Sequence, residues 1–156
     1  MQKARVEADL GLGPDTLLAT LGRGLENGED RASVALYARS LGQAASKDTG
    51  AFNKLTSART ATRYFKLADS AQATDTTALF LGNADVVLAI KLASEVPTTK
   101  RCEQAKELTD AVVDAQIVLP RAGRTFPESV ANLLRVANQL GPYGAQLTKA
   151  LCSRRN

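Results

Sequence analysis

The feature that most constrains the fold is the spacing of apolar side chains, which recur every three or four residues between glycine and proline stops. Spacings of four, three and four, for example, separate Leu108, Val112, Ala115 and Leu119. Such spacing places side chains on one side of a helix that has 3.6 residues per turn. Alanine and leucine supply most of the apolar residues, and aromatic residues make up only 4%, with no tryptophan. This composition favours closely packed helices over a sheet.

Glycine, proline and capping residues divide the chain into helical segments. Helices are expected from Pro14 to the Asn27-Gly28 stop, from near Asp30, over about 51–73, over 75–96, over 98–119 and after Thr125, with a short final segment after residue 142. Pro97, Pro120 and the pair Gly141-Pro142 are expected to end the segments before them, because proline cannot continue the hydrogen bonding of a helix. Thr125 and Glu128 have the spacing of a capping box for the helix that follows.

No internal repeat and no low-complexity linker divides the chain, and 156 residues suffice for one core. The sequence therefore predicts an all-α protein with a single helical domain over residues 1–156. The expected architecture is a compact antiparallel bundle of five to seven helices.

The segment over about residues 51–73 has the clearest amphipathic pattern. At about 100° per residue, its apolar side chains fall on one side: Leu55, Ala58, Ala61, Tyr64, Phe65 and Ala68. The cations Arg59, Arg63 and Lys66 cluster on the opposite flank. This flank is either the ordinary solvated side of a bundle helix or a lipid-binding site. In the second case the cations would meet lipid phosphates while Leu55, Tyr64 and Phe65 enter the acyl boundary.

The formal net charge of +4 favours an anionic partner but does not identify nucleic acid. Only seven aromatic residues are present, too few and too scattered to form a base-stacking platform, so nucleic acid is not expected. An anionic membrane is an equally good electrostatic partner, because each Lys or Arg near its surface contributes about 1 kcal/mol.

The chain contains no histidine, which removes the usual general base and the histidine-containing catalytic and zinc sites. Two carboxylate pairs at helical spacing, Glu103 with Glu107 and Asp110 with Asp114, could in principle hold metals. A di-metal bundle uses Glu-x-x-His motifs, so a solvated helix face or a polar contact between helices is the favoured interpretation. The sequence thus predicts a protein that is no enzyme and has no metal, cofactor or small-molecule substrate.

Two cysteines, Cys102 and Cys152, are fifty positions apart and are expected to be reduced, structural thiols. The N-terminal residues lack the apolar core of a secretory signal. The most apolar stretch, residues 78–96, is interrupted by Asn83, Asp85, Lys91 and Glu95. Membrane association is therefore expected to be interfacial, or to need those polar groups buried against other helices.

Two regions resemble a known family. Residues 28–70 contain the charged start Glu29-Asp30-Arg31, the segment Tyr37-Ala38-Arg39 and an amphipathic helix with Ser57, Arg59, Arg63, Phe65 and Lys66. This order is similar to the N-terminal region of the peroxisomal biogenesis factor 11 family. Residues 108–141, with Asp110, Asp114, Ile117-Val118-Leu119 and a closing Leu140-Gly141, resemble that family's final segment. Together the two regions cover about half of the chain.

The resemblance implies a protein that binds, curves and elongates the peroxisomal membrane before fission and that forms homo-oligomers. It implies a location at that membrane, peripheral or integral, and lipid contact on the helix that bears Ser57, Arg59, Arg63, Phe65 and Lys66. The chain departs from the family in its polar residues within 78–96 and in its lack of tryptophan. The alternative is a cytoplasmic, soluble helical interaction or assembly protein, such as a scaffold or a viral structural subunit.

Overall fold

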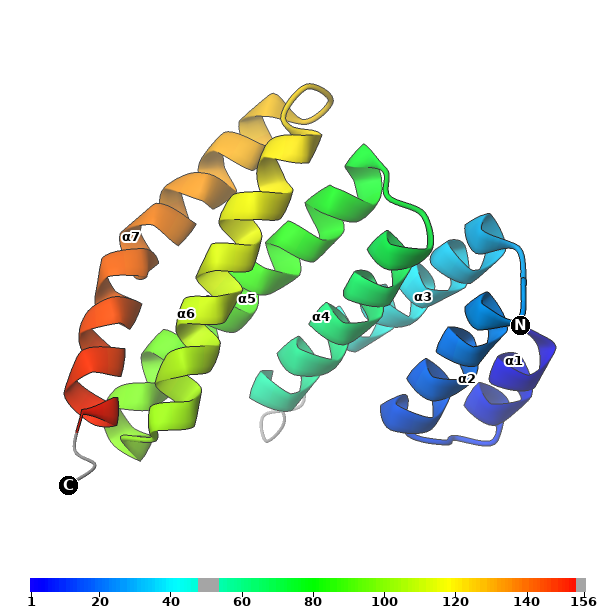
Figure 1. Cartoon of the computed structure of the whole chain (residues 1–156), viewed down its shortest axis with the longest axis horizontal. Helices are drawn as coiled ribbons and strands as arrows, with labels where there is room; N and C mark the ends of the chain where they lie inside the picture. The colour runs from blue at the N-terminus through cyan, green and yellow to red at the C-terminus, as the bar shows by residue number, and fades with distance from the viewer. Residues whose placement is uncertain (48–53, 154–156) are drawn as a thin grey trace. The chain divides into compact units, whose positions relative to one another are not determined.

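The computed structural model describes residues 1–47 and 54–153, and the predicted all-α class is confirmed: these ranges contain helices and no strand (Figure 1). The α-helices are α1 (Gln2–Asp9), α2 (Pro14–Glu26), α3 (Arg31–Ser46), α4 (Lys54–Ala71), α5 (Asp75–Thr99), α6 (Cys102–Val118) and α7 (Pro127–Cys152). The 3-10 helix η1 (Leu119–Ala122) lies between α6 and α7.

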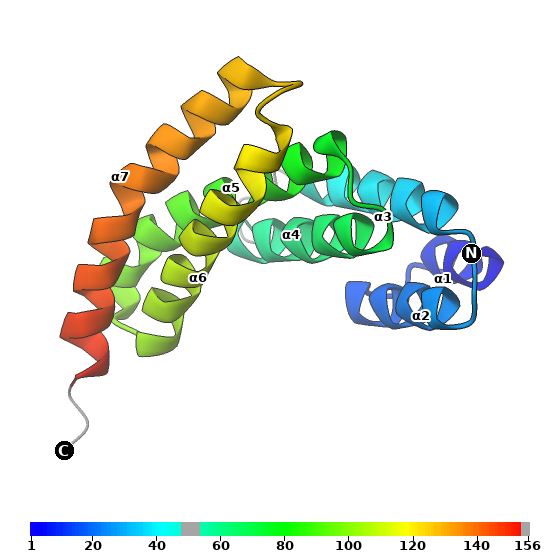
Figure 2. The ribbon, with the colours of Figure 1, turned by 45° about the horizontal axis from the view of Figure 1, so that its top comes forward.

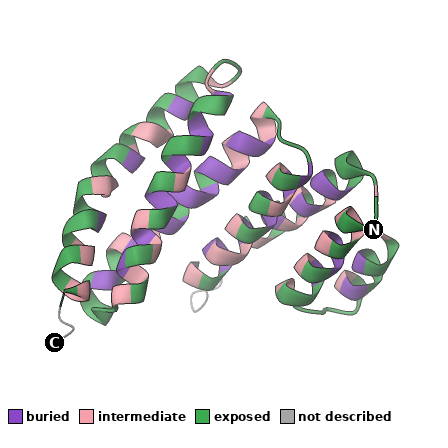
Figure 3. Ribbon diagram, viewed as in Figure 1, coloured by how far each residue is buried: buried purple, intermediate pink, exposed green. Residues whose placement is uncertain are grey.

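The chain divides into two compact units, Met1–Thr77 and Ala78–Asn156, which we call unit 1 and unit 2. Each has its own buried residues along its helices, where the ribbon is purple in Figure 3. The sequence predicts one bundle over the whole chain, and a single domain stays a prediction.

Unit 1 is built on α3 and α4, which pack along each other and run in opposite directions (Figures 1 and 2). The N-cap residue of helix α3 is Asp30, whose carboxylate accepts hydrogen bonds from the Ser33 amide at 3.0 Å and from the Ser33 hydroxyl at 2.6 Å. These bonds lower the pKa of the Asp30 carboxyl, and they cap the helix near the start that the sequence predicts.

The core of unit 1 joins all four of its helices. It is formed by Ala4, Leu17, Leu21, Val34, Ala35, Ala38, Tyr64, Ala68 and Ala71. Most of these side chains are small, so the helix axes can approach closely where they meet. Helices α3 and α4 also approach closely at Gly42, where a Cβ would lie 2.7 Å from Cε1 of Phe65. The absence of a side chain on α3 therefore makes room for the aromatic ring of α4.

Unit 2 packs α7 against α6 in opposite directions, with η1 in contact with both (Figure 1). The buried residues of α7 are Val130, Ala137 and Gly144, seven positions apart, which is the spacing of one stripe along two helical turns. A Cβ at Gly144 would lie 3.3 Å from Cγ of Leu108. Helix α5 approaches η1 at Gly82, where a Cβ would overlap the Leu119 side chain.

The prediction of reduced cysteines is wrong. Cys102 and Cys152 form a disulfide with an S–S distance of 2.08 Å and a Cα–Cα distance of 5.0 Å. The bond joins the first residue of α6 to the last residue of α7, which the antiparallel packing brings together. The sequence separation of fifty residues carries no information about this proximity, which only the helix pairing creates.

Two prolines do not end helices where the sequence predicts. Helix α7 continues through Gly141-Pro142 to Cys152, and α5 continues past Pro97 to Thr99. Beyond Pro142, the half-buried Leu147 and Leu151 and the disulfide at Cys152 tie the last turns of α7 to the unit. This tertiary attachment offsets the hydrogen bond that a proline removes from the helix.

Other predicted boundaries also need correction. The N-cap residue of α7 is Phe126, one position after the predicted Thr125. Helix α1 has no counterpart among the predicted segments, because only Ala4 and Glu7 are buried on it and its apolar stripe is almost absent. The helix predicted from near Thr98 begins at Cys102, after Lys100 leaves the helical conformation with φ 52°. The start of the helix predicted over 51–73 lies outside the described residues.

Candidate membrane-binding site

The predicted amphipathic segment is helical as α4 (Lys54–Ala71), and its apolar side packs inside unit 1. Tyr64 and Phe65 are each 3% exposed, and Leu55 is half-buried. Tyr64 belongs to the core cluster, and burial, as the largest cause, raises the pKa of its hydroxyl. In the folded unit, the two aromatic side chains are therefore inaccessible to an approaching membrane or protein surface.

The cationic flank of α4 remains accessible in part. Arg63 and Lys66 are exposed, whereas Arg59 is partly buried. The Arg63 guanidinium forms an ion pair of 2.6 Å with Asp15 of α2, and both side chains remain more than half exposed. This pair is too solvated to hold unit 1 together by itself. It leaves Lys66 as the more open of the two charges.

The structure thus brings the six predicted residues onto one helix but not into one surface. The side chains of Arg63 and Lys66 are exposed and the two aromatic side chains are buried, which is the arrangement of a bundle helix in its folded state. Contact of Tyr64 and Phe65 with lipid stays a prediction, and it would require α4 to separate from α3. The sequence pattern alone cannot distinguish these cases, since both need the same two-sided helix.

Helix α5 is, among the described residues, the one helix that is long and apolar enough to cross a membrane. Its most apolar window has a mean hydropathy of 1.4, and 56% of that window is buried within the protein. The core helix of a soluble bundle has the same properties. The polar residue Asp85 in its middle is 3% exposed, consistent with a helix that packs against protein.

The paired carboxylates of α6 lie on the outside or at the margin of unit 2. Glu103 and Asp110 are exposed, while Glu107 and Asp114 are partly buried. Over residues 1–47 and 54–153, no group of three or more His, Cys, Asp or Glu side chains is placed to hold a metal ion. The exposure of Glu103 and Asp110 favours a solvated face for those two residues, and the partial burial of Glu107 and Asp114 is compatible with a polar contact between helices.

A further apolar surface was not singled out from the sequence. In the described part of unit 1, the exposed large apolar side chains are Val6, Leu10, Leu12 and Leu36, between 44% and 71% exposed. Leu36 follows the buried pair Val34 and Ala35 by one or two positions and so falls on the other side of α3. The helical periodicity of residues 31–46 would have been enough to predict that Leu36 is exposed.

Comparison with known protein families, with curated proteins and with solved structures finds no match.

Proposed function

We propose that this protein is a non-enzymatic, membrane-binding protein that remodels the membrane to which it binds, at the peroxisome, as a homo-oligomer. The supporting observation is α4. It is helical over the residues that resemble the family's amphipathic helix, and it keeps Arg63 and Lys66 exposed. Each cation near an anionic lipid surface contributes about 1 kcal/mol to binding. In the folded state, the proposed contact of α4 with lipid is electrostatic and peripheral.

Insertion is a separate step in this proposal. The apolar side of α4 is occupied by the core, so its aromatic side chains reach lipid only if α3 and α4 separate. Such opening would expose Tyr64 and Phe65 to the acyl boundary and let the helix occupy area in one leaflet, which favours positive curvature. Binding and remodelling can therefore be measured independently.

Flotation of the full chain with vesicles tests binding. Vesicles of phosphatidylcholine with phosphatidylserine should carry the protein, and vesicles of phosphatidylcholine alone should not. The double variant Arg63→Glu and Lys66→Glu should bind at least about thirty-fold more weakly, because two cations worth about 1 kcal/mol each become repulsive. The matched control is Lys106→Glu with Arg135→Glu, which changes the same total charge at exposed positions of unit 2.

The controls separate local from general electrostatics. Equal losses in both double variants would mean that total charge, and not α4, governs binding. A wild-type chain that stays unbound on anionic vesicles at low salt would refute the membrane function itself.

A tryptophan in place of Tyr64 tests insertion, since the chain has no other tryptophan. Its fluorescence should be quenched by lipids with brominated acyl chains if α4 opens on the membrane. Unchanged emission in bound protein would restrict the contact to the cationic flank.

The second candidate is a soluble helical interaction or assembly protein. The burial of Tyr64 and Phe65, and of more than half of the α5 window, favours it. It predicts concentration-dependent self-association in sedimentation experiments without lipid, and no flotation with vesicles.

A further inference from the structure

The last turns of α7, residues 142–152, contain no fully buried side chain. Their one buried residue is Gly144, which has no side chain, whereas the earlier turns of α7 bury Val130 and Ala137. Burial of apolar side chains is the main contribution to helix packing. We call residues 142–152 the terminal segment, and its packing against α6 is weaker than that of the turns before it.

The local sequence also disfavours a helix in the terminal segment. Pro142 has no amide hydrogen to donate within α7, and Gly141 and Gly144 lower the helix propensity on either side of it. A helix as short as this segment is marginal in water by itself. The terminal segment is therefore helical because its contacts with α6 keep it so.

The non-covalent contacts of the terminal segment with α6 are modest. The Thr148 hydroxyl donates to the Ala105 carbonyl oxygen at 3.2 Å and lies 3.2 Å from the Thr109 hydroxyl. Leu147 and Leu151 are half-buried and so gain only part of the stabilisation that a core leucine gains. These contacts alone are weak support for a segment that contains a proline and a glycine.

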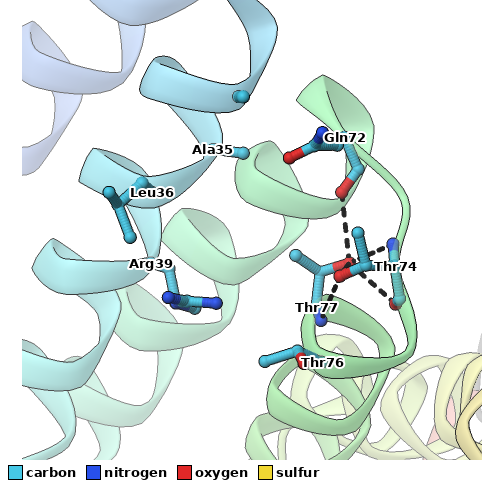
Figure 4. A pocket seen from close by; sticks show the side chains of 8 residues that line it. Ala35, Leu36, Arg39, Gln72, Thr74, Thr76 and Thr77 are labelled. Carbon is cyan, nitrogen blue, oxygen red and sulfur yellow. Dashed lines mark hydrogen bonds between the residues drawn. The ribbon is translucent and has the colours of Figure 1, made fainter.

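The turn from α4 to α5 in unit 1 shows how a helix junction is held without a covalent bond (Figure 4). The Thr77 hydroxyl is buried and donates to the Asp69 carboxylate at 2.8 Å. The Thr74 amide donates to the Thr77 hydroxyl at 2.8 Å, and the Thr77 amide donates to the Thr74 hydroxyl at 3.1 Å. The terminal segment has no buried hydroxyl of this kind, because Thr148 is half-buried.

The disulfide is the strongest link between the terminal segment and α6, and its sulfur atoms are within reach of solvent. Cys102 and Cys152 are both half-buried, at the start of α6 and the end of α7. The thiolate of a dithiol can attack one sulfur, which forms a mixed disulfide and releases the other cysteine as a thiolate. The second thiol of the reductant then displaces the remaining cysteine. The protein gains two thiols, and the dithiol is oxidised to a disulfide.

We propose that the Cys102–Cys152 disulfide is a redox-sensitive switch: its reduction by a dithiol releases the terminal segment from α6, while the rest of unit 2 stays folded. The hinge is at Gly141 and Pro142, where the helix already lacks a hydrogen bond. Release uncovers Leu108, which is fully buried and lies against the backbone at Gly144. The inference goes beyond the proposed membrane function and does not depend on it.

Hydrogen exchange of the full chain, without denaturant, before and after reduction by dithiothreitol tests the switch. Amides of residues 143–152 should exchange at least about tenfold faster after reduction, because the released segment opens locally. Amides of residues 109–118 and 128–140 should change by less than about twofold, and those of α3 and α4 should not change.

Three results would overturn the proposal. The first is unchanged protection of the terminal segment in chains whose two thiols have been titrated. The second is an equal loss of protection along all of α6 and α7, since reduction would then unfold unit 2 as a whole. The third is a disulfide that resists dithiothreitol until the protein is unfolded.

The variant Pro142→Ala tests the hinge. It restores an amide that can donate to the Asn138 carbonyl oxygen, so the reduced variant should exchange at residues 143–152 at least about tenfold more slowly than the reduced wild type. The matched control Gln146→Ala, at an exposed position of the same segment, should change that exchange by less than about threefold. Equal exchange in reduced Pro142→Ala and reduced wild type would refute release at this hinge.

Discussion

Units 1 and 2 are helical throughout their described parts but are stabilised differently. Unit 1 has no disulfide, and it buries the aromatic side chains Tyr64 and Phe65 among small residues. In unit 2, the described buried side chains are aliphatic apart from Asp85, and a disulfide joins the ends of α6 and α7. The comparison teaches that similar helical patterns can depend on a large side chain in one place and on a covalent link in another.

The largest effect should come from Phe65→Ala in unit 1. Truncation of a buried phenylalanine leaves a cavity and lowers the free energy of unfolding by about 3–5 kcal/mol. Hydrogen exchange during a urea titration should show the loss at the amides of α3 and α4. The exposed control Ile117→Ala should change stability by no more than about 0.5 kcal/mol. An equal loss of protection in α6 and α7 would mean that the units unfold together, and the comparison would fail.

Removal of the disulfide should destabilise unit 2. Cys102→Ser with Cys152→Ser frees a loop of about fifty residues in the unfolded chain, and should lower the free energy of unfolding by about 2–4 kcal/mol. Denaturation of the wild type with and without reductant should give the same difference.

Thiol titration of the native protein is the accompanying check on the disulfide. No thiol should react before reduction, and two should react after it. Two reactive thiols in the untreated protein would contradict the disulfide and would support the reduced cysteines predicted from the sequence. Disulfides persist mainly in oxidising compartments, so this measurement also bears on where the protein acts.

Two glycines of unit 2 allow a matched test of its close packing. Gly82→Ala should lower the free energy of unfolding by about 1–3 kcal/mol, because the new Cβ overlaps Leu119. Gly141→Ala adds a Cβ that meets Val112 at an ordinary 3.7 Å, and should stabilise α7 by up to about 1 kcal/mol. Thermal denaturation of the two variants should give shifts of opposite sign. Shifts of the same sign would contradict the packing at Gly82.

The smallest effect should follow removal of the Arg63–Asp15 ion pair in unit 1. Asp15→Asn should reduce stability by about 0.2–1 kcal/mol, since both side chains are more than half exposed. The difference from the wild type should vanish in molar salt. A larger, salt-independent loss would show that this pair, and not the aromatic packing, holds α2 to α4.

The helical class and the positions of most helices follow from local information. Apolar spacing, the Asp30 cap and the glycine stops act within a few residues, so α2 to α6 lie close to their predicted ranges. The same local rules fail at Pro142, because contacts with α6 and the disulfide at Cys152 stabilise the last turns of α7 beyond this proline. They also fail for α1, whose single fully buried alanine gives too weak a stripe to detect.

What surrounds each helix was decided only in three dimensions. The sequence determined that α4 has an apolar and a cationic side, because helical periodicity is intrinsic to the chain. Only the tertiary structure decided that Tyr64 and Phe65 face α3 and the core and that Cys102 meets Cys152. The physical reason is that a helix presents the same face to protein or to lipid, and the choice depends on residues far away in the sequence.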